Sequence, residues 1–74
     1  MAELGRNDEQ RNLVGMVLEF DVAVGLGTVE GPTGPVSFHC VEIADGSRHV
    51  EVGARVTFDL LPKLGRWEAT AIRV

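Results

Sequence analysis

Two glycines, Gly25 and Gly27, stand two residues apart inside the short apolar run Val24 to Val29. Glycine weakens the interior of a strand, so a pair at this spacing usually marks a sharp bend or a place where another part of the chain comes close. A small β-barrel needs both features together. We therefore predict a short barrel whose second strand, Val24 to Glu30, is coiled tightly at these glycines.

The other apolar runs supply four more predicted strands, which cover Leu13–Phe20, Val36–His39, Arg55–Leu61 and Arg66–Val74. Turn residues bound them, because glycine and proline cluster at 31–35 and 62–65, and a long loop at 40–50 carries its own turn signal. Hairpin, hairpin, long loop and hairpin connections predict an all-β fold, a five-stranded antiparallel Greek-key barrel of the OB type. An SH3-like barrel is the main alternative.

Alternation predicts which side chains share a face. Val56, Phe58 and Leu60 form one face of their strand, and Val36 and Phe38 form the core face of theirs. In the last strand, Ala69 and Ala71 oppose Glu68, Thr70 and Ile72. We expect Trp67 to be buried, because its large apolar area is useful to a barrel of this size.

Two stretches, Gly15 to Ile43 and Val52 to Val74, resemble a cold-shock domain, a small OB-type barrel of nucleic-acid-binding proteins. The family's first-strand motif G-x-V-K-W-F-N keeps Gly15, Val17, Phe20 and Asp21, and its RNA-binding motifs K-G-F-G-F-I and V-F-V-H-F align with Val24–Val29 and Val36–Cys40. The late strands align at Val56–Leu60 and Ala69–Ile72. The resemblance covers about sixty residues, as many as a minimal domain. It implies binding of single-stranded DNA or RNA.

The stacking rings that the resemblance implies are largely replaced in this chain. If Gly27 and Val29 point inward, Leu26 and Thr28 point outward, and His39 shares their surface. The family carries aromatic rings there because stacking contributes about 1–3 kcal/mol per base. Here Glu19 stands at the tryptophan position, and the phenylalanine positions hold Leu26, Thr28, Ser37 and Cys40. We expect weak binding.

The resemblance implies six contact residues for nucleic acid. Phe20, Leu26, Thr28 and His39 form the contact surface, and Arg48 and Arg66 assist through phosphate. The alternative hypothesis is a protein-interaction or self-associating barrel, either a monomer or a weak homodimer. It uses an apolar patch at the first hairpin made of Leu18, Phe20, Val22, Val24 and Leu26. Patches of this kind mark partner contacts unless their side chains turn into the barrel.

Charge and cysteine content narrow the possible partners and compartment. The net charge is −4, and residues 13–74 hold eight acidic and five basic residues, which argues against broad attraction to phosphate. Cys40 is the single cysteine, which fits a reducing cytoplasm. Residues 1–12 are polar and are expected to form a disordered tail, with neither a signal peptide nor a membrane span.

No residue pattern indicates catalysis. His39 and Cys40 are adjacent in a strand and so point to opposite faces, which disfavours a nucleophile pair. The acidic residues are scattered singly, and Gly25 and Gly27 lack the third glycine and the lysine of a phosphate loop. We expect no enzyme activity, no metal, no cofactor and no small-molecule substrate.

Overall fold

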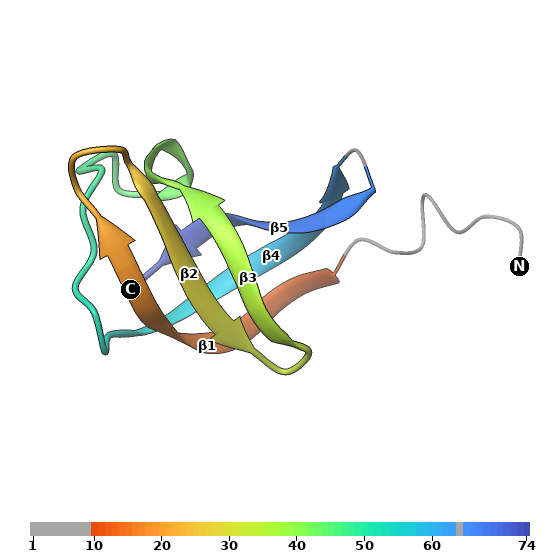
Figure 1. Ribbon diagram of the computed structural model, residues 1–74. Helices are drawn as coiled ribbons and strands as arrows, with labels where there is room; N and C mark the ends of the chain where they lie inside the picture. The colour runs from red at the N-terminus through yellow and green to blue at the C-terminus, as the bar shows by residue number, and fades with distance from the viewer. Residues whose placement is uncertain (1–9, 64) are drawn as a thin grey trace, which may run out of the picture.

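Five strands close into a β-barrel in the computed structural model, which describes residues 10–63 and 65–74 (Figure 1). In chain order the elements are β1 (Gln10–Asp21), β2 (Leu26–Gly31), β3 (Gly34–His39), the 3-10 turn η1 (Cys40–Glu42), β4 (Arg55–Lys63) and β5 (Arg66–Arg73). The order around the barrel is β1-β2-β3-β5-β4. The all-β barrel predicted from the sequence is confirmed. Residues 10–63 and 65–74 contain no helix long and apolar enough to span a membrane.

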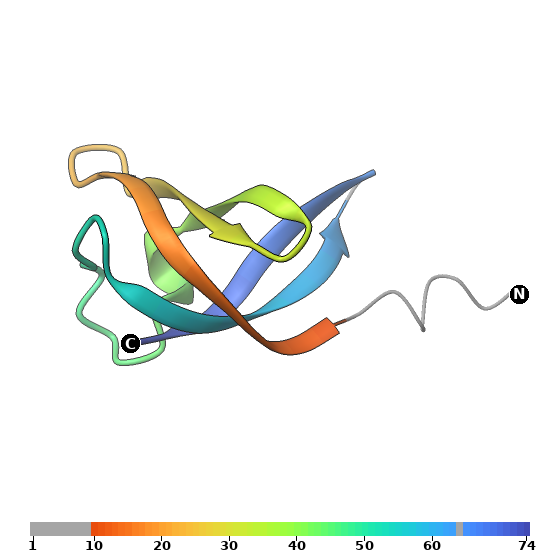
Figure 2. The same ribbon diagram turned by 90° about the horizontal axis from the view of Figure 1, so that it is seen from below.

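The long strand β1 belongs to both halves of the barrel. It pairs antiparallel with β2 through its second half and antiparallel with β4 through its first half. Figure 2 shows β1, in orange, crossing the barrel diagonally between these two neighbours. Strand β1 is therefore shared between the two halves of the barrel.

The barrel is mixed and not wholly antiparallel. Strands β2 and β3, and strands β4 and β5, form antiparallel hairpins, but β3 meets β5 in parallel at Ser37 and Glu68. An isolated bridge between Ile43 and Ile72 is also parallel. The all-antiparallel arrangement predicted above is wrong at this seam. A closed ring with an odd number of strands cannot alternate direction at every pairing, so at least one pair must be parallel.

The start of β1 lies earlier than the sequence predicted. Residues 10–12 were expected in a disordered tail but form the first residues of this strand, whereas residues 1–9 of that tail lie outside the described residues. The Asn12 N–H donates a hydrogen bond to Asp59 Oδ1 at 2.9 Å. A polar contact to β4 therefore orders a segment that has little apolar surface to bury.

Two phenylalanine rings fill the barrel interior, and glycines make room for them. Phe38 and Phe58 have no exposed surface. A Cβ atom on Gly27 would lie 2.7 Å from Phe38 Cε1, and one on Gly31 would lie 2.5 Å from Phe58 Cζ. The close approach predicted at Gly27 is thus confirmed. Gly25 instead allows the predicted bend, because it adopts a φ of 73° in the turn before β2.

The remaining core confirms the alternation predicted for the middle strands. The other buried apolar residues are Val17, Val29, Val36, Ile43, Val50, Val56, Leu60, Ala69 and Ile72. In β5, however, Ala69 and Ile72 both enter the core although they lie on opposite faces of a regular strand. Ala71 has a φ of 51°, and the β4–β5 register shifts between Thr57 and Asp59. This bulge rotates Ile72 inward, so the prediction that Ile72 opposes Ala69 is wrong.

Strand β4 continues through Pro62 and Lys63, which the sequence assigned to a turn. The described β1–β4 pairs end at Gln10 and Leu60, while the β4–β5 pairs continue to Lys63 and Arg66. Within residues 10–63 and 65–74, the hairpin therefore extends past the β1–β4 pairs as a two-stranded arm. Proline is tolerated there because an edge position does not need its missing N–H.

Candidate nucleic-acid interface

Strands β2 and β3 present a small exposed surface on their outer side. Their register sets Leu26 opposite His39 and Thr28 opposite Ser37. Leu26 is 44% exposed, Ser37 and His39 are exposed, and Thr28 is partly buried. These four residues are called the β2–β3 face below. The structure thus brings together three of the predicted contact residues, Leu26, Thr28 and His39.

Phe20 lies beneath this face and not on it. It pairs with Gly27, and its ring stacks parallel to that of Phe38 with a centroid distance of 6.0 Å and an interplanar angle of 4°. The ring of His49, from the loop before β4, meets Phe20 at 78° with a centroid distance of 5.8 Å. The β1–β2 register shifts between Val17 and Glu19, and this irregularity sets Phe20 opposite the glycine. Phe20 therefore has ring contacts with both Phe38 and His49.

The two predicted phosphate contacts lie at opposite ends of the barrel. Arg48 is exposed in the loop between η1 and β4, and Arg66 is exposed at the start of β5, beside the β4–β5 turn (Figure 1). Neither guanidinium lies within 4.0 Å of a carboxylate among residues 10–63 and 65–74. Both charges are therefore available to an anion.

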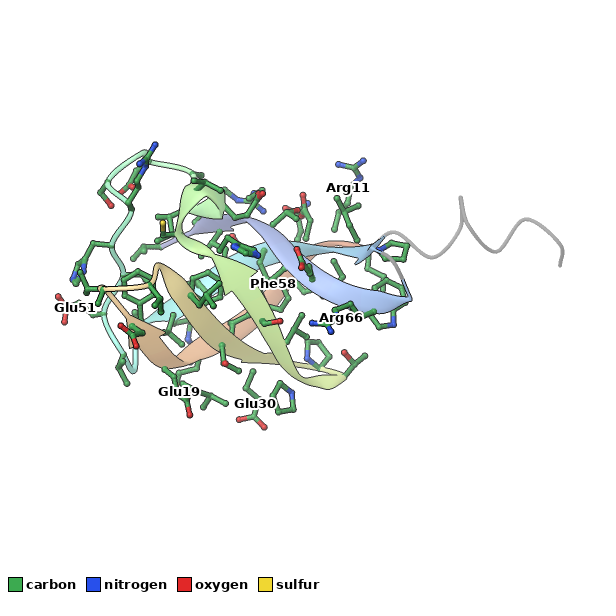
Figure 3. All side chains as sticks on the ribbon, turned by 45° about the horizontal axis from the view of Figure 1, so that its top comes forward. Arg11, Glu19, Glu30, Glu51, Phe58 and Arg66 are labelled. Atoms are coloured by element: carbon green, nitrogen blue, oxygen red, sulfur yellow. The ribbon has the colours of Figure 1, made fainter. Side chains whose placement is uncertain are left out.

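Acidic residues border the same surface. Glu19 pairs with Thr28 from the β1 side, and Glu68 pairs with Ser37 from the β5 side. Figure 3 shows Glu19 and Glu30 projecting from one side of the barrel, away from the buried Phe58. The face therefore offers little net attraction to a phosphate backbone, and binding there depends on contacts to the bases.

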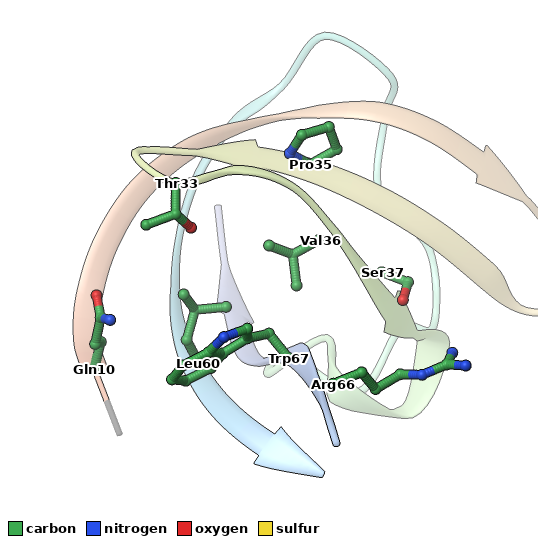
Figure 4. A pocket seen from close by; sticks show the side chains of 8 residues that line it. All are labelled: Gln10, Thr33, Pro35, Val36, Ser37, Leu60, Arg66 and Trp67. Atoms are coloured by element: carbon green, nitrogen blue, oxygen red, sulfur yellow. The ribbon is translucent and has the colours of Figure 1, made fainter. Parts of the chain in front are cut away.

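A cleft at the end of the barrel was not predicted from the sequence. It has a volume of about 520 Å³ and is lined by Gln10, Thr33, Pro35, Val36, Ser37, Leu60, Arg66 and Trp67 (Figure 4). We call it the mouth cleft. Trp67 is 39% exposed, so the prediction that this residue is buried is wrong. The signal that could have revealed the cleft is the pair Arg66-Trp67, a cation and a large ring directly after a hairpin turn.

The structure also shows where the residues of the apolar patch in the alternative hypothesis lie. Leu18, Val22, Val24 and Leu26 are all exposed, and Val22 and Val24 stand in the turn between β1 and β2. Phe20 is separated from them because it packs against the core. On the outer side of β1, the exposed residues Val14 and Met16 precede Leu18 at alternate positions.

The remaining reactive side chains of the described residues are the candidates for a metal or nucleophile site. Residues 10–63 and 65–74 contain no group of three His, Cys, Asp or Glu side chains that could hold a metal ion. His39 is exposed, whereas Cys40 packs against the core and its N–H donates to the Gly25 carbonyl at 2.8 Å. The Ser47 N–H donates to Asp45 Oδ1 at 2.8 Å, and this hydrogen bond lowers the pKa of the Asp45 carboxyl.

Comparisons with known proteins add no relative. No protein-family model and no curated protein matches this chain.

Proposed function

We propose that this chain is a cold-shock-like barrel of the OB type that binds single-stranded DNA or RNA weakly. The register of β2 and β3 is the observation that carries the proposal, because it sets Leu26 beside His39 and Thr28 beside Ser37 on one exposed surface. These are positions where the family that the chain resembles places stacking rings. The strand order β1-β2-β3-β5-β4 and the long connection after β3 support the OB assignment.

The side chains of the β2–β3 face explain why binding is weak. His39 offers a ring for stacking, while Leu26 and Thr28 offer only aliphatic contact to a base. Loss of about five stacking partners at about 1 kcal/mol each moves affinity from the micromolar toward the millimolar range. Arg48 and Arg66 supply two phosphate contacts, for which the slope of log K against log salt is about −1.4.

A titration with oligonucleotides tests this function. Isotope-labelled protein is titrated with hexathymidylate and hexauridylate, and the backbone amide shifts are followed. We expect shifts at Leu26, Thr28 and His39 at sub-millimolar ligand. Absence of movement at these amides up to several millimolar oligonucleotide would exclude the proposed face.

A gain-of-function pair sharpens this test. Thr28→Phe adds a ring to the β2–β3 face, whereas Val14→Phe adds the same ring to an exposed position where β1 pairs with β4. We expect Thr28→Phe to raise affinity by about fivefold or more, since one stacked base contributes at least about 1 kcal/mol. The Val14 variant should bind like the original chain. Equal affinity of both folded variants would show that β2–β3 is not the stacking surface.

Self-association is the second candidate function, and the exposure of Val22 and Val24 in the β1–β2 turn favours it. Valine is uncommon in exposed turns, where polar residues and glycine predominate. Sedimentation velocity between about 10 µM and 1 mM measures this function. A dimer that disappears in the double variant Val22→Ser and Val24→Ser would support it. A monomer at all concentrations would exclude it.

A further inference from the structure

The mouth cleft exists because β3 and β5 separate toward one end of the barrel. The two strands pair at Ser37 and Glu68, and they diverge toward the turns that precede β3 and β5. The floor of the cleft is the barrel core, since Val36 is 8% exposed and Leu60 is 2% exposed. Its volume of about 520 Å³ lies within the usual range for small-molecule sites.

Trp67 forms an apolar wall of this cleft. It shares the inward side of β5 with Ala69, which is fully buried. Trp67 lies near the start of β5 and pairs with Pro62 in the arm that extends past the barrel. Its indole ring therefore faces the cleft but keeps 39% of its surface exposed. A large, flat and partly exposed ring in a cleft is a stacking surface for a planar ligand.

The rim of the cleft is polar and carries one guanidinium. Gln10, Thr33 and Ser37 provide hydrogen-bonding groups, and Arg66 extends along the side on which Ser37 lies (Figure 4). Glu68 follows Arg66 on the same side of β5 and pairs with Ser37 of β3. The guanidinium of Arg66 is the cation of this rim, so a phosphate group is expected beside it.

We propose that the mouth cleft binds one nucleobase of a single-stranded nucleic acid, stacked on Trp67, with the adjoining phosphate at Arg66. This inference rests on the proposed function and adds a subsite to it. Ser37 belongs to both the β2–β3 face and the cleft, so a strand that crosses the face at Thr28 and Ser37 continues directly into the cleft. In this proposal, part of the base stacking takes place in the mouth cleft, whereas the family that the chain resembles stacks bases on the β2–β3 face.

Three variants test the subsite in a binding assay based on the fluorescence anisotropy of labelled hexathymidylate. Trp67→Leu keeps apolar volume and removes the ring, and we expect a loss of affinity of at least about fivefold. Trp67→Phe retains a ring and should recover part of that loss. Arg66→Gln should weaken binding and make the salt slope shallower by about 0.7. The matched control is Arg55→Gln, an exposed arginine of β4 outside the cleft, which should leave affinity unchanged.

Each outcome decides between the subsite and the wider function. Amide shifts at Ser37, Arg66 and Trp67 together with the β2–β3 face would support both. Shifts at Leu26, Thr28 and His39 without movement at Trp67 would overturn the subsite and leave the proposed function standing. Shifts at the cleft alone would support the subsite and exclude the face. Equal affinities of folded Trp67→Leu and the original chain would overturn the subsite.

Discussion

The rings of Phe20 and Phe38 stack across Gly27, nearly parallel and with their centroids 6.0 Å apart. The glycine pairs with Phe20 on one side and with Phe38 on the other, and it has no side chain to keep the two rings apart. Parallel rings at this separation are offset, which is a favourable geometry for aromatic pairs. The glycine motif of β2 is thus a requirement of core packing, whatever the outer face binds.

Replacing Gly27 by alanine is expected to destabilise the fold. The added Cβ would lie 2.7 Å from Phe38 Cε1 and 2.8 Å from the Glu19 carbonyl oxygen, and the latter belongs to the backbone. Overpacking of this kind costs about 1–3 kcal/mol. Thermal unfolding followed by circular dichroism should show Tm lowered by roughly 4–8 °C per kcal/mol. Ser37→Ala, on the exposed side of β3, is the control and should change Tm little. An unchanged Tm for Gly27→Ala would contradict the packing described here.

Replacing Phe20 by leucine separates its structural role from any binding role. The variant loses the ring pair with Phe38, which contributes about 0.5–1.5 kcal/mol beyond apolar burial. We expect the free energy of unfolding in urea to fall by at least that amount, while the Kd for hexathymidylate changes less than about twofold. The reverse result, unchanged stability with lost binding, would make Phe20 a direct contact.

Asp59 of β4 contacts residues of both β1 and β5, so removing its charge should lower the stability of the fold. Its side chain is 15% exposed, lies 3.6 Å from Arg73 and 4.0 Å from Arg11, and accepts the Asn12 N–H. Hydrogen bonds to charged groups contribute about 1.5–3 kcal/mol. We predict that Asp59→Asn lowers the free energy of unfolding by about 1–3 kcal/mol and speeds amide exchange at Asn12. Glu51→Gln, in an exposed pair with His49, should stay within about 0.5 kcal/mol. Equal effects of the two substitutions would refute the role assigned to Asp59.

The Asp45 carboxyl should titrate below its ordinary pKa of 3.8, because the Ser47 N–H donates a hydrogen bond to its charged form. A pKa that is lower in the folded state means that ionised Asp45 favours folding above the unfolded-state value. This contribution disappears as the pH falls through the folded-state value. Carboxyl carbon shifts measured against pH check the direction. Ser47→Ala retains the backbone donor, so part of the lowering should persist, and a midpoint at or above 3.8 in the original chain would contradict the hydrogen bond.

Regular alternation was sufficient to predict most of the core. Val36 and Phe38 in β3, and Val56 and Phe58 in β4, point inward as their spacing indicates. The bulge at Ala71 could not be predicted, because a register shift depends on the partner strand and breaks local alternation. The parallel seam, in contrast, follows from the strand number alone once a closed barrel of five strands is accepted.

The candidate site was predictable to the same extent. Leu26, Thr28 and His39 share a surface because they stand at alternate positions of paired strands. Phe20 packs against Phe38, an arrangement that alternation does not predict, because an irregularity in β1 sets it opposite Gly27. Trp67 was misplaced for a different reason. The alternation of β5 correctly predicts the side on which Trp67 lies. The sequence does not show where the barrel closes and the two-stranded arm begins.

The parallel seam between β3 and β5 is the most weakly paired side of the barrel. Elsewhere around the ring, neighbouring strands are held by several antiparallel pairs, whereas β3 and β5 share the Ser37–Glu68 pair. Among the seams of the ring, separating β3 from β5 therefore breaks the fewest described strand pairs. If the mouth cleft binds a base as proposed, the weakly paired β3–β5 seam sets its width, so purines and pyrimidines should bind with similar affinity.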